Sequence, residues 1–431
     1  MAAPTYISRD IMDRILEGKD PKERLHQLTP RVPTDEPLPP RIPRGNDHSV
    51  CGLETRRGFL EQQGVSLGDL GSAAPGTIRL SELQGNIENL IGFAELPVGA
   101  IGPLRVNGTC AFGDFYVPMA TTEGALIASC NRGAYAISQS GGAAAACLTE
   151  SVSRAPCFVF KCMSESGRFL AWALDTFDSL QHVVEGTSSH CRLVDVKTSI
   201  IGKEVYLIFE YTTGDASGQN MVTMATDAVC RYLVEHTPVQ PVQWYVEGNM
   251  SGDKKATMMA FTYARGKKVV AETVIRKKVL KRFLHTDPQE MIRYWEISFM
   301  GGAQSGSIGV QGHYANTLAA LFIACGQDAA CVSEASVGMT RMDLTDEGNL
   351  YVSVSLPNLI VGTVGGGTHL PSARACLHML DCQGTGNARK FAEICAATAL
   401  AGEISIIAAL AAGEFARAHS AYGRRTKPPS S

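Results

Sequence analysis

The stretch that decides the fold is Arg192–Tyr211, RLVDVKTSIIGKEVYLIFEY. β-Branched and aromatic residues dominate both of its ends, and Ile201-Gly202-Lys203 divides them. β-Branched and aromatic residues favour strands, and glycine favours the turn between two strands. The stretch therefore predicts two strands, Arg192–Ser199 and Glu204–Tyr211, that are joined by a short turn.

The flanking segments complete a pattern of six elements. Cys157–Cys162 (CFVFKC) and Val242–Val246 predict strands, whereas Gly167–Glu185 and Met221–Glu235 have the apolar spacing of helices. The resulting order, β-α-β-β-α-β, is the split βαβ arrangement of ferredoxin-like domains. We therefore expect residues 156–247 to form a small ferredoxin-like domain that is inserted into a larger one.

The rest of the chain predicts a larger lobe of mixed helices and strands, so the expected fold class is α+β. This lobe combines residues 88–155 with 248–431 around a long central helix, which an alanine-rich segment places at 387–419. Residues 1–87 predict a helical N-terminal region with a proline-rich linker at Pro30–Pro43. The other elements expected are a hairpin of strands 256–264 and 268–276, helices near 287–300 and 313–326, and strands near 338–343 and 350–355.

The composition is that of a folded protein with more than one lobe. Its 431 residues exceed the ~250–300 at which a single hydrophobic core stops growing, and 45% of them are hydrophobic. A net charge of −3 argues against nucleic acid as an electrostatic partner. The 43 glycines have no Gly-X-Y period, so they are expected at turns, at close packing and at ligand-binding loops.

The cysteines and the apolar segments predict a soluble, cytoplasmic protein with no membrane partner. The count of 13 cysteines is odd and no C-x-x-C occurs, so reduced thiols are expected. Residues 1–14 lack the apolar core of a signal peptide. The apolar segment 395–412 is rich in alanine and contains Glu403, which favours a packed helix over a membrane span.

Several common site motifs are missing from the sequence. It has no P-loop, no G-x-G-x-x-G after a strand and no G-x-S-x-G elbow. It also has no H-E-x-x-H motif and no paired cysteine and histidine spacing, so no metal is expected. These absences argue against Rossmann-type dehydrogenases, α/β-hydrolases and zinc enzymes.

Candidate acids and proton donors lie in glycine-rich or charged clusters. Glu123, in PMATTEG, is either a helix-capping residue or a buried acid with a raised pKa, suited to donating a proton. Asp328, in CGQD, is either a helix-end group or a buried functional acid. His419, at the end of the expected long helix, is either an ordinary terminal histidine or a late proton donor.

Two lysines follow an aspartate at Asp253-Lys254-Lys255 and lead into an expected strand, where alternation would send them to opposite faces. One interpretation leaves one lysine exposed and pairs the other with Asp253. In the other, a lysine held by a carboxylate polarises a carbonyl oxygen and stabilises its developing negative charge. The successive glycines 365–367 would let backbone amides approach a ligand.

Together these clusters resemble one family, hydroxymethylglutaryl-CoA reductase, over about residues 80–420. The expected small domain also resembles the nucleotide-binding domain of that family. The matching segments, in order, are ENLIGFAELPVGAIGPL at 88–104, PMATTEG at 118–124, DKK at 253–255, CGQD at 325–328, VGTVGGGT at 361–368 and AGEISIIAALAAG at 401–413.

The resemblance implies a four-electron reduction of (S)-3-hydroxy-3-methylglutaryl-CoA to mevalonate and free CoA, through mevaldyl-CoA and mevaldehyde, in the mevalonate (isoprenoid) pathway. NADPH is the expected hydride donor and NADH is the alternative. By resemblance, Glu123 protonates the aldehyde-level oxygen and Lys254 stabilises the oxyanion. Asp328 holds this network, and His419 protonates the departing CoA thiolate.

The resemblance also implies binding residues and an oligomer. Arg154 and Lys255 match residues that bind the free carboxylate of the acyl-CoA substrate. The family's sites lie between two subunits, so a dimer or tetramer is expected. The substrate-binding candidates are Glu88, Asn89, Arg154, Asp253, Lys255, His313, Asn316 and Ile406. The cofactor-binding candidates are Ser188, Arg192, Asp215, Gly218, Asn220, Gly365, Gly366, Gly367 and Thr368.

The sequence departs from the family pattern on the cofactor side. Ser217 and Gln219 replace two methionines of the usual DAMGMNM. Ser189 stands where many members place an arginine near the extra phosphate of NADPH. The loss of that guanidinium weakens one basis for phosphate selection, although Arg192 is close in sequence.

It also departs on the acyl side, where Ile297 stands for a usual lysine and Glu247 for a usual serine. A lost cation and an added carboxylate weaken the binding of a dianionic acyl group. Two alternatives therefore accompany the main expectation: a reductase of a different acyl-CoA thioester, and a non-catalytic paralogue that binds CoA esters. The presence of all four catalytic candidates argues against the paralogue.

Overall fold

The computed structural model describes residues 47–65, 79–262 and 265–415, together with positions 20, 40 and 43. The chain divides into two compact units, Met1–Ala74 with Arg79–Phe93 and Pro75–Ile78 with Ala94–Ser431. Most of the expected proline-rich linker lies outside the described residues.

The first unit contains helix α3 (Val50–Gln62) and the 3-10 helix η1 (Leu80–Leu83). Ser49 caps α3, because its side chain accepts a hydrogen bond from the Gly52 amide. Arg56 is buried and donates to the Leu90 carbonyl at 2.7 Å. This bond ties the helix to the segment that follows η1.

The second unit is built on a ten-stranded sheet with the order β7-β4-β6-β3-β8-β10-β9, where β1 also pairs with β2 and β3, and β5 pairs with β6. Apart from the parallel pair of β1 and β3, the pairs are antiparallel. The expected α+β class is confirmed at this level. The strands are β1 (Val98–Gly108), β2 (Phe112–Ala120), β3 (Ala143–Arg154), β4 (Cys157–Val159), β5 (Arg192–Ile201), β6 (Glu204–Thr212), β7 (Gln243–Tyr245), β8 (Gly266–Ile275), β9 (Met339–Leu344) and β10 (Leu350–Leu359).

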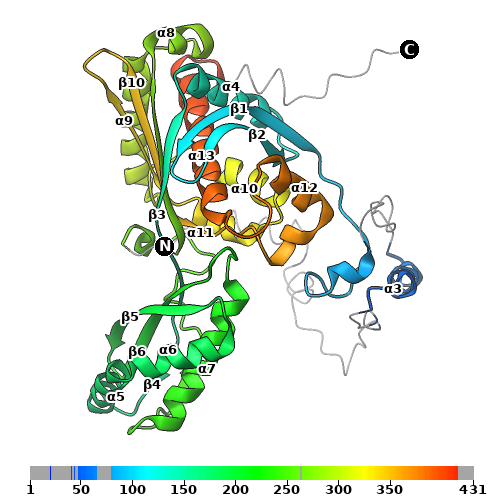
Figure 1. Ribbon diagram of the computed structural model, residues 1–431, viewed down its shortest axis with the longest axis vertical. Coiled ribbons are helices and arrows are strands. Elements are labelled where there is room, and N and C mark those ends of the chain that lie inside the picture. The colour runs from blue at the N-terminus through cyan, green and yellow to red at the C-terminus, as the bar shows by residue number, and fades with distance from the viewer. Residues whose placement is uncertain are drawn as a thin grey trace. The chain divides into compact units, whose positions relative to one another are not determined.

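Helices pack around the strands of this sheet (Figure 1). The α-helices are α4 (Leu126–Gln139), α5 (Met163–Asp175), α6 (Phe177–Thr187), α7 (Gln219–His236), α8 (Lys277–Val279), α9 (Pro288–Ser305), α10 (Tyr314–Ala324), α11 (Val332–Ala335), α12 (Pro371–Met379) and α13 (Ala388–Ala411). The shorter turns are the 3-10 helices η2 (Met258–Phe261), η4 (Ala329–Cys331) and η5 (Gly366–His369) and the π-helix η3 (Leu280–Leu284).

Helix α13, drawn in red in Figure 1, lies in the middle of the larger hydrophobic core. It contacts α4, α9 and α10 as well as β1, β3, β8 and β10, so side chains are buried all round it. Its length and hydropathy would allow a membrane span, yet 83% of its apolar window is buried inside the fold. The helix ends at Ala411, before Gly413 at φ +67°, rather than at the expected His419.

A second hydrophobic core, which runs from Val152 to Val239, belongs to the smaller group of strands and helices. These strands are ordered β7-β4-β6-β5. The one helix expected over 167–185 is two helices, α5 and α6, which meet at Thr176. Strand β3 joins both cores, because most of it pairs with β8 and its last residues, 152–154, pair with β6.

The expected hairpin of strands 256–264 and 268–276 is wrong. Its second half is β8, but the first half contains η2, with 3-10 hydrogen bonds from Ala260 to Thr257 and from Thr262 to Met259. Strand β8 already has β3 on one edge and β10 on the other. No edge of β8 is therefore left for a hairpin partner.

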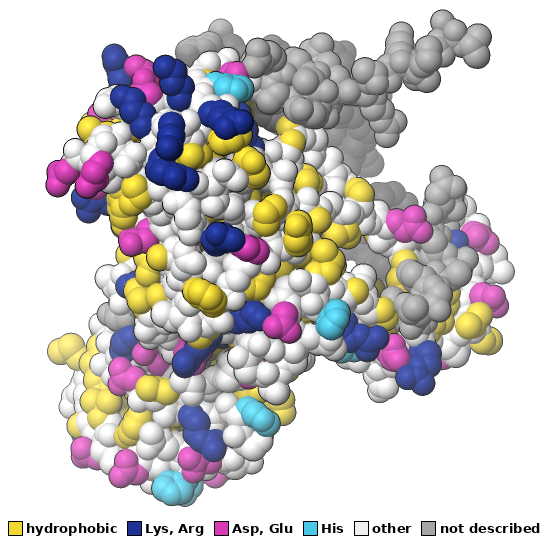
Figure 2. Space-filling view, turned by 45° about the horizontal axis from the view of Figure 1, so that its top comes forward, with side chains coloured by type: hydrophobic (Ala, Val, Ile, Leu, Met, Phe, Trp, Pro, Cys, Tyr) yellow, Lys and Arg dark blue, Asp and Glu magenta, His cyan; other side chains and the backbone are white. Residues whose placement is uncertain are grey.

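The net charge of −3 conceals a local concentration of positive charge. Helix α8 and the π-helix η3 that follows it carry exposed basic side chains, and Figure 2 shows dark-blue side chains gathered at this end of the molecule. The exposed basic residues of the segment are Arg276, Lys277, Lys278, Lys281 and Arg282.

Candidate active site

Lys254 lies in a turn and not in a strand, so the expected alternation of the two lysines does not apply. Its φ of +55° is in the left-handed region, which non-glycine residues seldom adopt. Its backbone N–H donates to Glu334 Oε1 at 3.1 Å. Lys255 Nζ donates to the backbone carbonyl of Asp253 at 2.8 Å, so the predicted pairing with the Asp253 carboxylate is also wrong.

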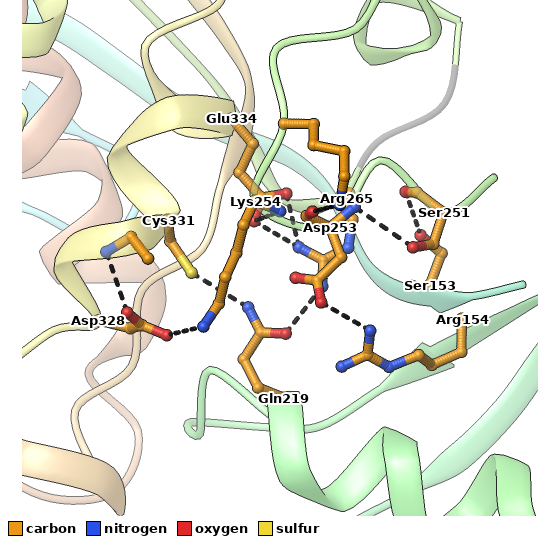
Figure 3. A network of polar contacts seen from close by, with 12 residues as sticks. Ser153, Arg154, Gln219, Ser251, Asp253, Lys254, Arg265, Asp328, Cys331 and Glu334 are labelled. Carbon is orange, nitrogen blue, oxygen red and sulfur yellow. Dashed lines mark hydrogen bonds and ion pairs between the residues drawn. The ribbon is translucent and has the colours of Figure 1, made fainter. Parts of the chain in front are cut away.

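The Lys254 side chain instead pairs with Asp328 (Figure 3). The distance between Nζ and Oδ2 is 2.7 Å, and the two side chains are 42% and 40% exposed. The hydrogen bond from Lys254 to Asp328 is the main reason that the pKa of the lysine is raised, so the amine stays charged. Asp328 is exposed, and its Oδ1 also caps η4 by accepting from Ala330. It is therefore a helix-end group and the partner of Lys254 at once.

Beside this pair is a largely buried network of charges (Figure 3). Arg265 Nη1 lies 2.6 and 2.5 Å from the two carboxylate oxygens of Glu334. Its Nη2 donates to Asp253 Oδ1 at 2.8 Å, and Arg154 Nη1 donates to Asp253 Oδ2 at 2.7 Å. Partial burial by itself raises the pKa of Asp253, but the charges of Arg265 and Arg154 outweigh it, so the pKa lies below its usual value.

Sequence reasoning missed Arg265, Glu334 and the contact of Gln219 with Arg265. Arg265 lies between the two strands of the incorrect hairpin, 256–264 and 268–276, where only a turn is expected. Glu334 stands alone in an apolar stretch, and a lone acid of this kind was the only signal available. The 69 residues between Arg265 and Glu334 kept the pair from being recognised.

In the single chain Glu123 is neither a helix cap nor a buried side chain. The residue is exposed, and the N-cap of α4 is Ala125, with φ +74° and no side-chain capping bond. Both Glu123 carboxylate oxygens instead accept from Asn316 Nδ2, at 3.0 and 2.8 Å. The structure thus brings together two of the predicted site residues from distant parts of the chain.

The two pairs that these predicted residues form lie at opposite ends of α10. Asn316, with Glu123, is in its first turn, whereas Asp328, with Lys254, comes after its last residue, Ala324. The helix rises ~1.5 Å per residue, so Asn316 and Ala324 are ~12 Å apart along its axis. Within one chain, the acid Glu123 and the cation Lys254 therefore lie at different ends of α10.

The start of α10 is held by a buried acid from α13. Glu403 is fully buried and accepts from the backbone amides of Gly312, at 2.8 Å, and His313, at 2.5 Å, and from Thr340 Oγ1, at 2.9 Å. Burial raises the pKa of Glu403 to about 7, and burial lowers the pKa of His313 to about 4. His313 is therefore a neutral side chain near neutral pH.

Ile406, one turn along α13 from Glu403, lines a cavity of about 250 Å³. The wall is largely apolar and comes from α9, α13 and the segment before α10. Such a lining suits the apolar part of a small molecule. The other lining residues are Tyr294, Trp295, Ser298, Val310, Gln311, Gly312, Thr340, Glu403, Ile407, Leu410 and Phe415.

The predicted cofactor residues gather around the end of β6. Arg192, at the start of β5, is paired in register with Thr212, and Asp215 follows shortly after. Asp215 is already engaged: its carboxylate accepts from the Gly386 amide at 2.7 Å and from the Ala388 amide at 3.0 Å, at the start of α13. The Asp215 carbonyl also accepts from the Thr363 amide at 2.8 Å, which brings the 362–368 loop to the same place.

The glycines of this loop have two different surroundings. A Cβ at Gly367 would lie 2.7 Å from the Gly326 carbonyl oxygen, so the CGQD segment packs directly on the loop. A Cβ at Gly365 or Gly366, both with positive φ, would meet no other described atom within 4 Å. Ser188 is half-buried and Asn220 is exposed. Gly218 is buried as the left-handed N-cap of α7, and Thr368 donates to the Gly365 carbonyl at 2.7 Å.

Three predicted residues are not among the described residues of the second unit. Glu88 and Asn89 are exposed members of the first unit, which is described by itself. His419 lies outside the described residues. Within the parts of the chain that the structure describes, no group of three or more histidine, cysteine, aspartate or glutamate side chains could hold a metal ion.

Comparisons with known proteins agree with the motif clusters. Residues 52–424 match the model of the family described as hydroxymethylglutaryl-coenzyme A reductase. The chain is 43% identical over 414 residues to 3-hydroxy-3-methylglutaryl-coenzyme A reductase of Aeropyrum pernix, with 94% of this chain and 97% of that protein covered. The same enzyme of Pyrococcus abyssi is 39% identical over 426 residues, with 96% and 99% covered.

Among solved structures, the chain is similar to a class II 3-hydroxy-3-methylglutaryl-CoA reductase from Streptococcus pneumoniae bound to NADPH. The TM-score is 0.62 at 18% identity, with 83% of this chain and 96% of that chain covered, and this likeness concerns the fold. The matches of sequence over nearly the full length settle the family. The chain is an enzyme that belongs to the hydroxymethylglutaryl-coenzyme A reductase family.

Proposed function

We propose that the chain reduces (S)-3-hydroxy-3-methylglutaryl-CoA to mevalonate and free CoA with NADPH, as a cytoplasmic enzyme of the mevalonate pathway. The observation that carries the proposal is the 2.7 Å ion pair of Lys254 with Asp328, in which the lysine side chain is 42% exposed. A charged amine that is held in place but open on one side is suited to meeting an oxyanion.

In this proposal the chain's own residues supply charge and protons. The reduced nicotinamide supplies a hydride in each of the two steps. Lys254 stabilises the negative charge that develops on the carbonyl oxygen, while Asp328 keeps the amine charged and in place. Glu123, oriented by Asn316, donates a proton to the aldehyde-level oxygen, and His419 protonates the departing thiolate.

We infer that a second chain completes the site, in a dimer or tetramer. Glu123 contacts Asn316 in the first turn of α10, whereas Lys254 contacts Asp328 beyond the last residue of that helix, Ala324. Asn316 and Ala324 are ~12 Å apart along the helix axis. Direct action on one carbonyl oxygen requires both groups within hydrogen-bonding distance of it. A partner chain whose Glu123 end meets the Lys254 end of this one satisfies that requirement.

The residues around the end of β6 fit a nicotinamide dinucleotide. Gly365 and Gly366 are exposed, and a Cβ at either position would meet no described atom within 4 Å, so a dinucleotide can approach the backbone closely there. Arg192 makes a loose ion pair with Glu185, at 3.7 Å, and Nη1 donates to the Cys191 carbonyl at 3.0 Å, which leaves other donors of the guanidinium for an added phosphate. We therefore favour NADPH over NADH, on a small domain that we propose to be ferredoxin-like.

The contacts of Arg154 favour an alternative substrate with a different acyl group. Arg154, a candidate for binding the free carboxylate, is already bonded to Asp253 at 2.7 Å and lies 3.5 Å from Glu247. Ile297, at the position of an expected lysine, is 61% exposed and uncharged. A different acyl-CoA thioester, without a second negative charge, is the second candidate substrate.

A steady-state assay of NADPH oxidation tests these proposals. We expect turnover with 3-hydroxy-3-methylglutaryl-CoA, slower turnover with other acyl-CoAs, and a higher kcat/KM for NADPH than for NADH. Turnover with only another thioester would favour the alternative substrate. An equal kcat/KM for both nucleotides would remove the NADPH preference.

A further inference from the structure

We propose that Arg265 is a positioning residue, which fixes the Lys254 turn against α11 and links that turn to the first residue of α7. The inference rests on the proposed function of Lys254. It concerns a residue that touches neither substrate nor cofactor in that proposal and acts through the groups that it holds.

Arg265 is placed at a junction of three chain segments (Figure 3). Its side chain is 3% exposed, and its two terminal nitrogens both have partners. Nη1 meets Glu334 of α11, and Nη2 donates at 2.8 Å to Asp253 Oδ1 and at 2.8 Å to Gln219 Oε1. One buried guanidinium thus holds α11, the Lys254 turn and α7 together.

The contact with Glu334 acts directly on the backbone of Lys254. Glu334 Oε1 accepts from Arg265 Nη1 at 2.6 Å and from the Lys254 amide at 3.1 Å, so one oxygen serves both. A lysine at φ +55° keeps that conformation only where its surroundings hold it. The Arg265–Glu334 pair on one side and Asp253 on the other provide those surroundings, and they set the direction in which the amine of Lys254 leaves the turn.

The contact with Gln219 connects this turn to the cofactor side of the proposed site. Gln219 is the first residue of α7, between the cofactor candidates Gly218 and Asn220. Its Oε1 accepts from Arg265, and its Nε2 donates to Cys331 Sγ at 3.1 Å, in the η4 turn that Asp328 caps. A movement of α7 would therefore reach both members of the Lys254–Asp328 pair.

The geometry requires an arginine. A guanidinium presents five N–H donors in a plane, so it can donate to several acceptors that lie in different directions. A lysine at position 265 would keep the positive charge with one nitrogen. It would compensate Glu334 or Asp253, but it would not hold Glu334, Asp253 and Gln219 together.

The test compares Arg265→Lys with Arg105→Lys, a matched change in an arginine that makes 2.8 Å bonds to both oxygens of Asp114 on the β1–β2 hairpin. The readouts are kcat, KM for each substrate, and the pH dependence of amine labelling at Lys254, followed by mass spectrometry. For Arg265→Lys we expect kcat to fall by about 10–100-fold, because a small misplacement of a reacting group costs that much. We expect KM to change less than about 3-fold, and the labelling pKa of Lys254 to fall towards its ordinary value as the contact with Asp328 loosens.

A second variant covers a failure of Arg265→Lys to fold. Gln219→Met lies at a partly exposed position and removes only the link to α7, so a folded protein with a smaller fall in kcat is expected. Folded variants that match Arg105→Lys in both kcat and labelling pKa would overturn the inference. If Arg265→Lys does not fold, the result for Gln219→Met decides alone.

The proposed function and this inference are tested by different outcomes. Full activity of Lys254→Ala would remove the role of Lys254 in the reaction, whatever Arg265 does. The labelling pKa of Lys254 does not depend on turnover, so it would still show whether Arg265 positions that amine. An inactive Lys254→Ala beside unaltered Arg265→Lys and Gln219→Met would remove only the positioning role.

Discussion

Two ion pairs meet at Lys254. Its side chain pairs with Asp328, and its backbone amide donates to Glu334, which pairs with Arg265. The two pairs differ in exposure and in the number of their contacts. Lys254 and Asp328 are 42% and 40% exposed and meet through one 2.7 Å contact. Arg265 and Glu334 are 3% and 0% exposed, and one nitrogen of the arginine meets both carboxylate oxygens. The first pair can be screened by water and salt, whereas the second is shielded from both.

The difference teaches which pair can do chemistry and which can only hold its place. A cation that must stabilise a new negative charge has to keep part of its surface open to it, as Lys254 does. A buried charge that lost its partner would have no solvent to compensate it. The exposed pair is therefore suited to reaction and the buried pair to fixing geometry, and variants of each pair can test that division.

The largest effect on stability is expected from Glu334→Ala. This change leaves the buried guanidinium of Arg265 without its main partner, and breaking a buried pair typically costs ~3–5 kcal/mol. Equilibrium urea unfolding monitored by circular dichroism measures the loss. The control is Asp343→Ala in the exposed pair with Arg341, where ~0–1 kcal/mol is expected. A loss of similar size in the two variants would contradict the division.

Lys254→Ala should have the converse effect, with little change in stability and a large change in rate. Its ion pair is more than a third exposed, so its loss should cost no more than ~1 kcal/mol. The loss of one group that stabilises an oxyanion typically lowers kcat by ~10²–10³-fold. Steady-state kinetics with substrate at saturation measures the fall, and a kcat within a few-fold of the parent's would mean that another group meets the oxyanion.

The sequence was sufficient for those parts of the fold and site that depend on neighbouring residues. The alternation of Arg192–Tyr211 predicted β5 and β6, and the alanine-rich segment after Asn387 predicted α13. The motif clusters predicted the family, which the comparisons confirm. In each case the signal lies within a few residues of the feature that it predicts.

The failures concern features that tertiary contacts decide. Residues 256–264 have the composition of a strand, but the edges of β8 are taken by β3 and β10. The turn at Lys254 is held by Glu334, which lies 80 residues away in the sequence. Glu123 depends on Asn316 in the same way, across 193 residues. No local pattern carries such information.

A second buried carboxylate extends the comparison, because Glu403 has backbone amides and a hydroxyl in place of a cation. Burial raises the pKa of Glu403 from 4.5 to about 7, so the folded state binds an extra proton between these values and loses stability as the pH rises through them. His313 has the opposite sign: burial lowers its pKa from 6.5 to about 4, so its contribution grows as the pH rises from 4 to 6.5. The two effects cancel between about pH 4.5 and 6.5 in the parent.

Glu403→Gln removes the titration of Glu403, leaves that of His313, and keeps a side-chain oxygen that can accept from the amides of Gly312 and His313. The free energy of unfolding of the variant, minus that of the parent, should therefore rise by ~1.4 kcal/mol per pH unit between pH 5 and pH 7. Urea unfolding at half-unit intervals of pH measures this slope, and other titrating groups drop out of the difference. Parallel curves for variant and parent would mean that the amides and the hydroxyl fully offset the burial of the Glu403 carboxylate. The folded protein would then hold no extra proton at Glu403 between these pH values.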